Sequence, residues 1–112
     1  MHARWKQLVS EKELQECIAH SSENTQVIFK HSTRCIISKM ALQQFEEQLD
    51  SIPASVNLLF LDLLSHRDIS NAVAAQLNVH HESPQVIVVK NGKAIFHESH
   101  HSIDAAVVAD NC

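Results

Sequence analysis

The sequence predicts an α/β fold in which helices flank a mixed β-sheet. Short apolar runs alternate with amphipathic stretches along most of the chain. A continuous apolar run at 56–64 suits a strand buried on both faces, and Asn91-Gly92 is typical of a two-residue hairpin. The resulting order is β-α-β-α-β-α-β-β-α. Strand–helix alternation favours parallel strands joined by right-handed crossovers, to which the hairpin adds two antiparallel strands.

The first third of the chain predicts two strands with a helix between them. Residues 5–9 are apolar at alternate positions and indicate a short first strand. Ser10 and Glu13 have the spacing of a capping box, so a helix should begin after Ser10. Its apolar residues, among them Cys17, follow helical spacing, and we expect Cys17 to be a small core residue. Residues 27–30 form a short β-branched and aromatic run that ends at Lys30, and they predict an interior strand.

The middle of the chain predicts two further helices around the apolar strand at 56–64. One helix should run from Cys35 to about Asp50, because apolar residues recur there at helical spacing and Pro53 closes the stretch. Ser65 and Asp68 indicate a second cap, with Ser65 as the capping residue. The apolar spacing after this cap predicts a helix through Leu77.

The last third predicts the hairpin and a final helix. Residues 85–90 and 93–98 are the two hairpin strands on either side of Asn91-Gly92. Ser102 and Asp104 can open a last helix, which the following Ala and Val residues continue. No repeat or low-complexity linker interrupts the order.

Length and charge restrict the class of protein. The 112 residues, 45% of them hydrophobic, fit a single domain spanning 1–112. A formal net charge of -4 argues against nucleic-acid binding, which needs a basic surface. No stretch approaches the roughly 18 apolar residues of a membrane span, and the first residues lack the apolar run of a secretory signal. We therefore expect a cytoplasmic protein that contacts no membrane.

The cysteines and histidines indicate neither a disulfide framework nor a metal site. Three cysteines cannot all pair within one chain, and a reducing compartment would keep them as thiols. We expect Cys112 to be a flexible, exposed thiol. The nine histidines lack the spacing of common metal motifs, so we predict no bound metal and place most of them in exposed loops. His81 and Glu82 are different, because they precede Pro84 and can tune a nearby thiol or contact substrate.

Cys35 is the candidate nucleophile. It lies between a buried strand and the predicted start of a long helix, where unpaired N–H groups and the helix dipole favour an anion. Its sulfur can point at the amides of Ile37 and Ser38, and Arg34 and Lys39 add positive charge. Each effect favours the thiolate, which is the reactive form of cysteine.

Ser38 stands where a second cysteine would complete a dithiol. It can donate a hydrogen bond to the Cys35 sulfur, but it cannot expel a captured group by forming an internal disulfide. Such a site favours one-thiol exchange, in which an external thiol must release the group that Cys35 captures. The Cys-x-x-Ser pattern is short and common, and the alternative is that Cys35 merely starts a helix and Ser38 is a surface polar residue.

The position of Pro84 strengthens the first interpretation. A thiol between an apolar strand and an amphipathic helix, early in a β-α-β unit, is the thioredoxin arrangement. Pro84 begins the strand before the hairpin, where thioredoxin-like folds have a cis-proline that faces the cysteine. Ser83 would then offer its backbone N–H and C=O to an extended substrate chain. An ordinary proline at the edge of a strand is the alternative.

The sequence resembles the monothiol bacilliredoxins, a bacterial thioredoxin-like family. The resemblance covers most of the chain and is most specific in the segments 29–38, 79–85 and 90–93, and weaker at Ser99-His100. It implies a thioredoxin-like fold and the removal of bacillithiol from mixed disulfides on oxidised proteins. Thioredoxins usually carry a buried acid six residues before the cysteine. Here that residue is Phe29, which fits a site with no second thiol to activate.

The resemblance also implies roles for individual residues. Cys35 is the nucleophile, Ser38 occupies the resolving position, and Ser83-Pro84 is the cis-proline element. Thr33, Arg34, Glu82, Ser83 and Pro84 are the expected substrate-binding residues. Bacillithiol is the expected co-substrate, with no bound cofactor, and S-bacillithiolated proteins are the expected partners. Bacillithiol carries a malate group, whose carboxylates Arg34, Lys30 or Lys39 can hold.

Two other functions remain open from the sequence. A thioredoxin-like binding module would use the same groove without turnover. An iron–sulfur carrier of the monothiol glutaredoxin type usually needs a Cys-Gly-Phe-Ser site, which Ile36-Ile37 matches poorly. A Cys35→Ser variant distinguishes the binding module from an enzyme, because the enzyme would lose turnover whereas the module would still bind its partners.

Overall fold

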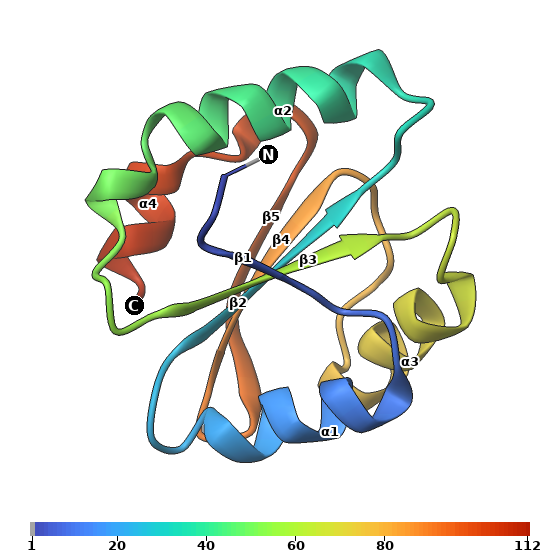
Figure 1. Ribbon diagram of the computed structural model, residues 1–112, viewed down its shortest axis with the longest axis vertical. Helices are drawn as coiled ribbons and strands as arrows, with labels where there is room; N and C mark the ends of the chain where they lie inside the picture. The colour runs from blue at the N-terminus through green and yellow to red at the C-terminus, as the bar shows by residue number, and fades with distance from the viewer. Residues whose placement is uncertain (1) are drawn as a thin grey trace.

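The computed structural model describes residues 2–112, which form a five-stranded sheet of order β1-β3-β2-β4-β5 (Figure 1). β1 and β2 pair with β3 in parallel, whereas β4 is antiparallel to both β2 and β5. The predicted α/β class and order of elements are confirmed. The strands are β1 (Trp5–Gln7), β2 (Gln26–His31), β3 (Asn57–Asp62), β4 (Gln85–Lys90) and β5 (Lys93–Ser99).

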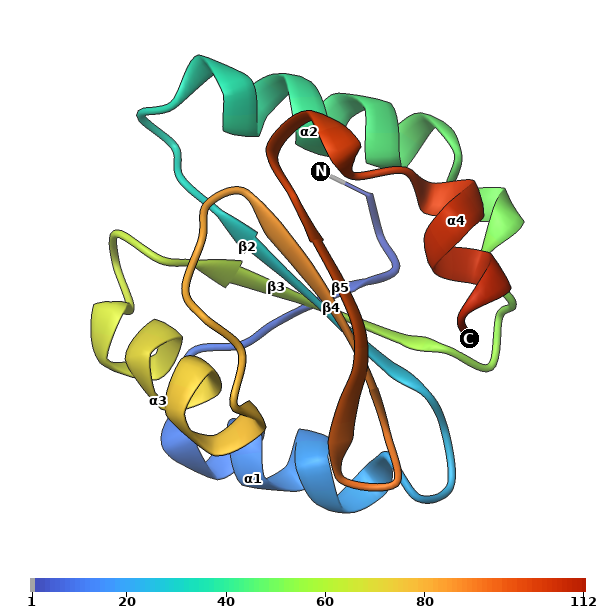
Figure 2. The same cartoon turned by 180° about the vertical axis from the view of Figure 1, so that it is seen from behind.

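Helices cover both faces of the sheet (Figures 1 and 2). α1 (Glu11–His20) and α3 (Arg67–Leu77) lie on one face, and α2 (Ile36–Glu47) and α4 (Ala105–Asp110) lie on the other. Two short 3-10 turns, η1 (Leu49–Ser51) and η2 (His100–Ser102), precede β3 and α4. Among residues 2–112, no helix combines the length and apolarity needed to cross a membrane.

An aromatic cluster holds α2 against the sheet. The rings of Trp5, Phe29, Phe45 and Phe60 lie with centroids 5.3–5.9 Å apart in four contacting pairs. Phe45 belongs to α2 and is 1% exposed, while the other three rings come from β1, β2 and β3. Aromatic pairs at such distances add to the stabilisation that burial provides. The cluster therefore fixes the helix whose first turn follows Cys35.

The second core lies on the face covered by α1 and α3. Cys17 is 3% exposed in this core, among Leu14, Ile28 and Val73. This confirms Cys17 as a small core residue. Burial raises the pKa of its thiol to about 12, so the thiol stays protonated at neutral pH.

Two of the predicted helix caps are confirmed and one is wrong. Ser10 Oγ accepts from the Glu13 N–H at 3.2 Å, and Asp104 accepts from the Ala106 N–H at 2.8 Å. The third cap is His66, not Ser65, and it makes no side-chain capping bond. The Ser65 hydroxyl is already used, because it donates to Asp62 Oδ2 at 3.1 Å.

Two smaller expectations are also corrected. The helix after Cys35 ends at Glu47 rather than near Asp50, and a 3-10 turn continues the same apolar stripe. Cys112 is half-buried rather than exposed: its thiol donates to Val108 O at 3.2 Å and it packs on the aromatic core. The Asn91-Gly92 hairpin is as predicted, with φ of 52° and 76° at its two residues.

Replacing Phe45 by Ala should lower the free energy of unfolding by about 3–5 kcal/mol, because it leaves a cavity between α2 and the sheet. Urea unfolding measures the change. Gln43→Ala, an exposed substitution on the same helix, is the matched control and should change stability little. Equal effects of the two substitutions would show that the aromatic cluster does not anchor α2.

Candidate functional site

Cys35 is the N-cap of α2, four residues after β2 ends. Its backbone is extended, with φ -107° and ψ 122°, and its N–H donates to Ser32 O at 3.3 Å. The side chain is half-buried. The sulfur accepts no capping hydrogen bond from the first turn, which differs from the predicted contact with the Ile37 and Ser38 amides. The helix dipole still favours negative charge at this position.

The Ser38 hydroxyl makes no hydrogen bond with the Cys35 sulfur but ties the first turn of α2 to the end of β2. Its Oγ accepts from the Ser32 N–H at 3.0 Å and lies 2.7 Å from His31 Nδ1. Ser38 is fully buried and His31 is 5% exposed. The expected hydrogen bond from Ser38 to the sulfur is absent from the hydrogen bonds of residues 2–112. The physical reason is that two other partners already occupy the Ser38 oxygen.

His31 is a site residue that the sequence analysis missed. It packs against Phe60, with ring centroids 5.4 Å apart. Burial lowers the pKa of His31, and the charge of Asp62 opposes this in part. The ring is therefore neutral at neutral pH and can share a hydrogen bond with Ser38. The feature of the sequence that could have indicated His31 was its position between an apolar strand and a polar loop.

The strand that follows Pro84 lies beside β2. The register pairs Phe29 with Val86 and Lys30 with Gln85, so Pro84 lies level with the end of β2. Both cartoon views show the loop before β4 next to the end of β2, from which the chain runs into α2 (Figures 1 and 2). The Ser83–Pro84 peptide bond is cis. Cys35 and Pro84 thus approach the same edge of the sheet from different strands.

Ser83 has unused hydrogen-bonding groups at this edge. Its N–H and C=O take part in none of the backbone hydrogen bonds found outside helices and strands in residues 2–112. Its Oγ and the Oε1 of Gln85 are the two buried side-chain nitrogen or oxygen atoms of the described chain that have no hydrogen-bond partner. These two oxygens belong to the residues on either side of Pro84, so the surroundings of Pro84 are unusually polar for a buried position.

Lys30 is completely buried, which overturns its expected role in holding carboxylates of a ligand. Its side chain points into the core on the α3 face of the sheet. There its Nζ donates to Ser70 O at 3.1 Å and lies 3.1 Å from His81 Nδ1. Burial lowers the pKa of Lys30 to about 8. No local pattern indicated this position, because lysine is rarely fully buried.

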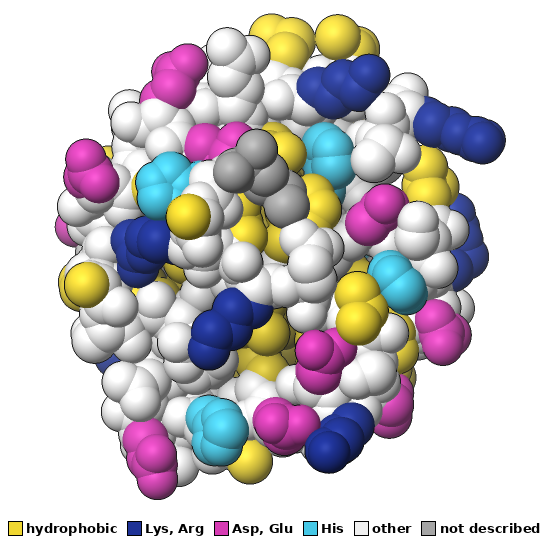
Figure 3. Space-filling model, in the orientation of Figure 1, with side chains coloured by type: hydrophobic (Ala, Val, Ile, Leu, Met, Phe, Trp, Pro, Cys, Tyr) yellow, Lys and Arg dark blue, Asp and Glu magenta, His cyan; other side chains and the backbone are white. Residues whose placement is uncertain are grey.

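The surface around Cys35 combines apolar and basic side chains. Thr33, Arg34 and Lys39 are exposed, and so are Ile36 at 69% and Met40 at 49%. In Figure 3 hydrophobic and basic side chains lie next to each other along the upper rim, over α2. The exposed residues could contact a ligand on Cys35, with Arg34 and Lys39 as the accessible cations.

His81 and Glu82 lie in the loop that leads to Pro84, and both are partly buried. Burial first, and then the positive charge of Lys30, lowers the pKa of His81. The Ser99 hydroxyl and the surrounding histidines lower the pKa of Glu82. No group of three or more potential ligands in residues 2–112 is arranged to hold a metal ion.

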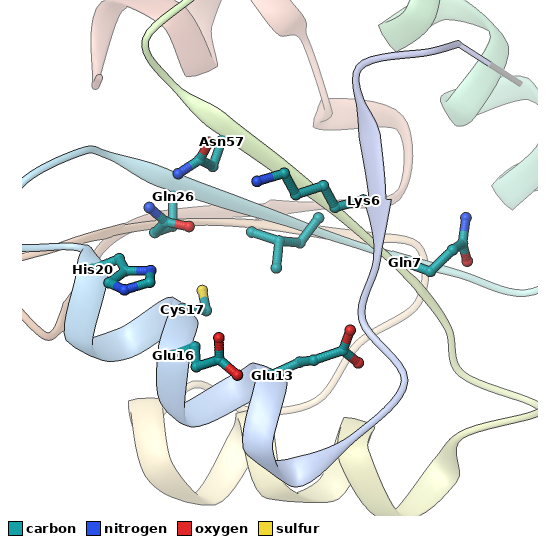
Figure 4. Close-up of a pocket in the computed structure, with 9 residues that line it drawn as sticks. Lys6, Gln7, Glu13, Glu16, Cys17, His20, Gln26 and Asn57 are labelled. Carbon is teal, nitrogen blue, oxygen red and sulfur yellow. The ribbon is translucent and has the colours of Figure 1, made fainter.

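A pocket of about 160 Å³ lies far from Cys35, at the opposite end of the strands. It is lined by residues of β1, β2 and β3 and by one face of α1, including Cys17 (Figure 4). The Cys17 side chain points from α1 toward the sheet. Because its thiol is protonated at neutral pH, Cys17 does not provide a second nucleophile.

Comparison with known proteins agrees with this geometry. The family model described as monothiol bacilliredoxin BrxC matches residues 6–108. A solved protein described as having a thioredoxin fold is 28% identical, with a TM-score of 0.80 over 95% of this chain and 91% of the other.

Two thioredoxins show the same fold at lower identity. The thioredoxin of Malassezia sympodialis is 20% identical, with a TM-score of 0.71 over 94% of this chain and 84% of the other. Mitochondrial thioredoxin 3 of Saccharomyces cerevisiae is also 20% identical, with a TM-score of 0.69 over 95% and 91%. The thioredoxin-like fold expected from the sequence is confirmed.

Replacing Ser38 by Ala should lower the free energy of unfolding by about 1–3 kcal/mol, because it leaves the Ser32 N–H and the His31 ring without a partner. Urea unfolding at pH 7 measures the change. Lys39→Ala, an exposed change on the same turn, is the control. A loss no larger than that of the control would contradict a joining role for Ser38.

Proposed function

Because the chain belongs to the monothiol bacilliredoxin family, we propose that it is a thiol–disulfide oxidoreductase that removes bacillithiol from mixed disulfides on oxidised proteins. The family and the thioredoxin fold support the thiol oxidoreductase class. The observation that carries the proposal is the position of Cys35 as the N-cap of α2, with a buried serine at the resolving position.

The proposed reaction has two steps. The Cys35 thiolate attacks the bacillithiol sulfur of the mixed disulfide, the old S–S bond breaks, and the client leaves as a thiolate that takes up a proton. A second bacillithiol thiolate then attacks the bacillithiol sulfur on Cys35. This step releases bacillithiol disulfide and returns Cys35 to the thiolate. In sum, one bacillithiol thiol is oxidised, the client thiol is restored, and no bound cofactor is required.

The client chain is proposed to dock along the edge formed by Ser83 and Pro84. An extended segment can pair with the free N–H and C=O of Ser83, as an added strand does at a sheet edge. Thr33 and Glu82 would border this segment from the two flanking loops. Ile36 and Met40 offer exposed apolar contacts on the same side of Cys35.

The accessible cations are proposed to bind the malate carboxylates of bacillithiol. Arg34 and Lys39 are exposed and belong to the segment around Cys35, whereas Lys30 is excluded by burial. Arg suits this role because its guanidinium can hold a carboxylate through two hydrogen bonds. Exposed pairs of this kind contribute little individually.

In the wild type, release of bacillithiol from Cys35 should require an external thiol. The Ser38→Cys variant should release it alone, because the introduced thiol can form an internal disulfide with Cys35. The measurement is free bacillithiol after one turnover on a bacillithiolated protein. Cys35→Ser should be inactive, and Cys17→Ser and Cys112→Ser should behave as the wild type. Release by the wild type without added thiol would contradict the one-thiol mechanism.

Charge reversal at Arg34 and Lys39 together should lower the rate with bacillithiol disulfide by about fivefold. The rate with the neutral 2-hydroxyethyl disulfide should change much less, because it has no carboxylates. Lys12→Glu, an exposed reversal on α1, is the control for overall charge. Equal losses with both disulfides would remove the carboxylate-binding role.

A further inference from the structure

Lys30 is a buried cation that the proposed reaction does not use. Its side chain has no exposed surface, yet both hydrogen-bond partners found for its Nζ in residues 2–112 are uncharged. One partner is the Ser70 carbonyl near the start of α3, and the other is the ring of His81. Burying an ammonium without a carboxylate is costly, so a role beyond stability is expected.

The chemistry of the contact fixes the state of His81. A protonated lysine can donate but cannot accept, so His81 Nδ1 must be the acceptor at 3.1 Å. The ring is then neutral and carries its proton on Nε2. Burial and the neighbouring charges of Lys30, Arg67 and His80 lower the pKa of His81, and Glu82 opposes them. With a pKa of about 8, Lys30 itself is mainly protonated at pH 7.

The contact joins three parts of the fold at the docking edge. Lys30 belongs to β2, Ser70 to α3, and His81 to the loop that runs into Ser83 and Pro84. The Ser70 hydroxyl also lies 3.4 Å from His81 Nδ1. Gln85 is the register partner of Lys30, so both side chains point to the same face of the sheet. Thus Lys30 contacts the loop before Pro84 through its side chain and is paired with the strand after Pro84 through its backbone.

We propose that Lys30 is a positioning residue, whose buried ammonium holds His81 and thereby sets the loop at Ser83 and Pro84 against which the client chain docks. The proposal rests on the proposed function for the identity of the client, but its structural part concerns residues of this chain alone. It assigns Lys30 to substrate affinity rather than to the chemistry of Cys35, which starts a helix on the other face of the sheet.

The first test is spectroscopic and needs no substrate. Long-range proton–nitrogen NMR spectra of the histidine rings report which ring nitrogen carries the proton. In the wild type, His81 should be the Nε2–H tautomer at pH 7. In Lys30→Met, which keeps most of the length of the side chain but removes the donor, His81 should become a mixture of tautomers and protonate at higher pH. An Nδ1–H tautomer in the wild type, or an unchanged His81 in the variant, would overturn the proposal that Lys30 holds His81.

The second test separates affinity from chemistry. With a bacillithiolated protein as substrate, Lys30→Met and His81→Leu should each raise KM by about tenfold, the loss of one charge-assisted hydrogen bond, while kcat changes less than twofold. His81→Asn should stay near the wild type, since its amide oxygen can replace Nδ1 as acceptor. The double variant should be no worse than either single one. His80→Leu, an exposed neighbour, is the control and should have no effect.

The two tests distinguish a failure of the proposed function from a failure of the positioning role. If the wild type does not turn over bacillithiolated protein, the proposed function is wrong, but the NMR result still decides whether Lys30 holds His81. If turnover is normal and Lys30→Met leaves KM unchanged, the positioning role is wrong and the proposed function stands. A loss of kcat equal to the rise in KM, or an equal loss in His81→Asn, would show general loosening of the fold and would also overturn the proposal.

Discussion

The hydrogen bonds of Ser38 are the constraint on which the candidate site depends. Its buried oxygen accepts from the Ser32 N–H and pairs with His31, so the end of β2, the loop and the first turn of α2 are held as one unit. The aromatic cluster behind Phe45 fixes the rest of the helix. Cys35 is consequently held at the helix start by residues for which no hydrogen bond to its sulfur is found in residues 2–112.

The same residue explains why the proposed exchange uses one thiol. A hydroxyl cannot form a disulfide that would release the group captured on Cys35, and the Ser38 hydroxyl is already paired with Ser32 and His31. The captured group must then leave by an external thiol. The proposed roles lie on opposite faces of the sheet: the candidate nucleophile Cys35 caps α2 on one face, while Lys30 contacts α3 and the loop before Pro84 on the other.

The sequence predicted the fold well because its signals were local. The capping box at Ser10, the Asn91-Gly92 turn and the apolar run in β3 each specify an element without help from distant residues. The site was less predictable, because its partners depend on contacts across the sheet. Lys30 was expected to be able to hold a carboxylate of the ligand, but the pairing of β2 with β4 and the packing of α3 bury it beside His81. Likewise, Ser38 was placed against Cys35 by spacing, but the end of β2 competes for its hydroxyl.

We expect Cys35 alone to capture bacillithiol. Intact-mass and peptide mass spectrometry after incubation with bacillithiol disulfide, without other thiols, tests it most directly. The expected result is one bacillithiol per chain, located on Cys35 and stable until a thiol is added. An adduct on Cys17 or Cys112, or no adduct in a folded protein whose Cys35 reacts with iodoacetamide, would contradict it.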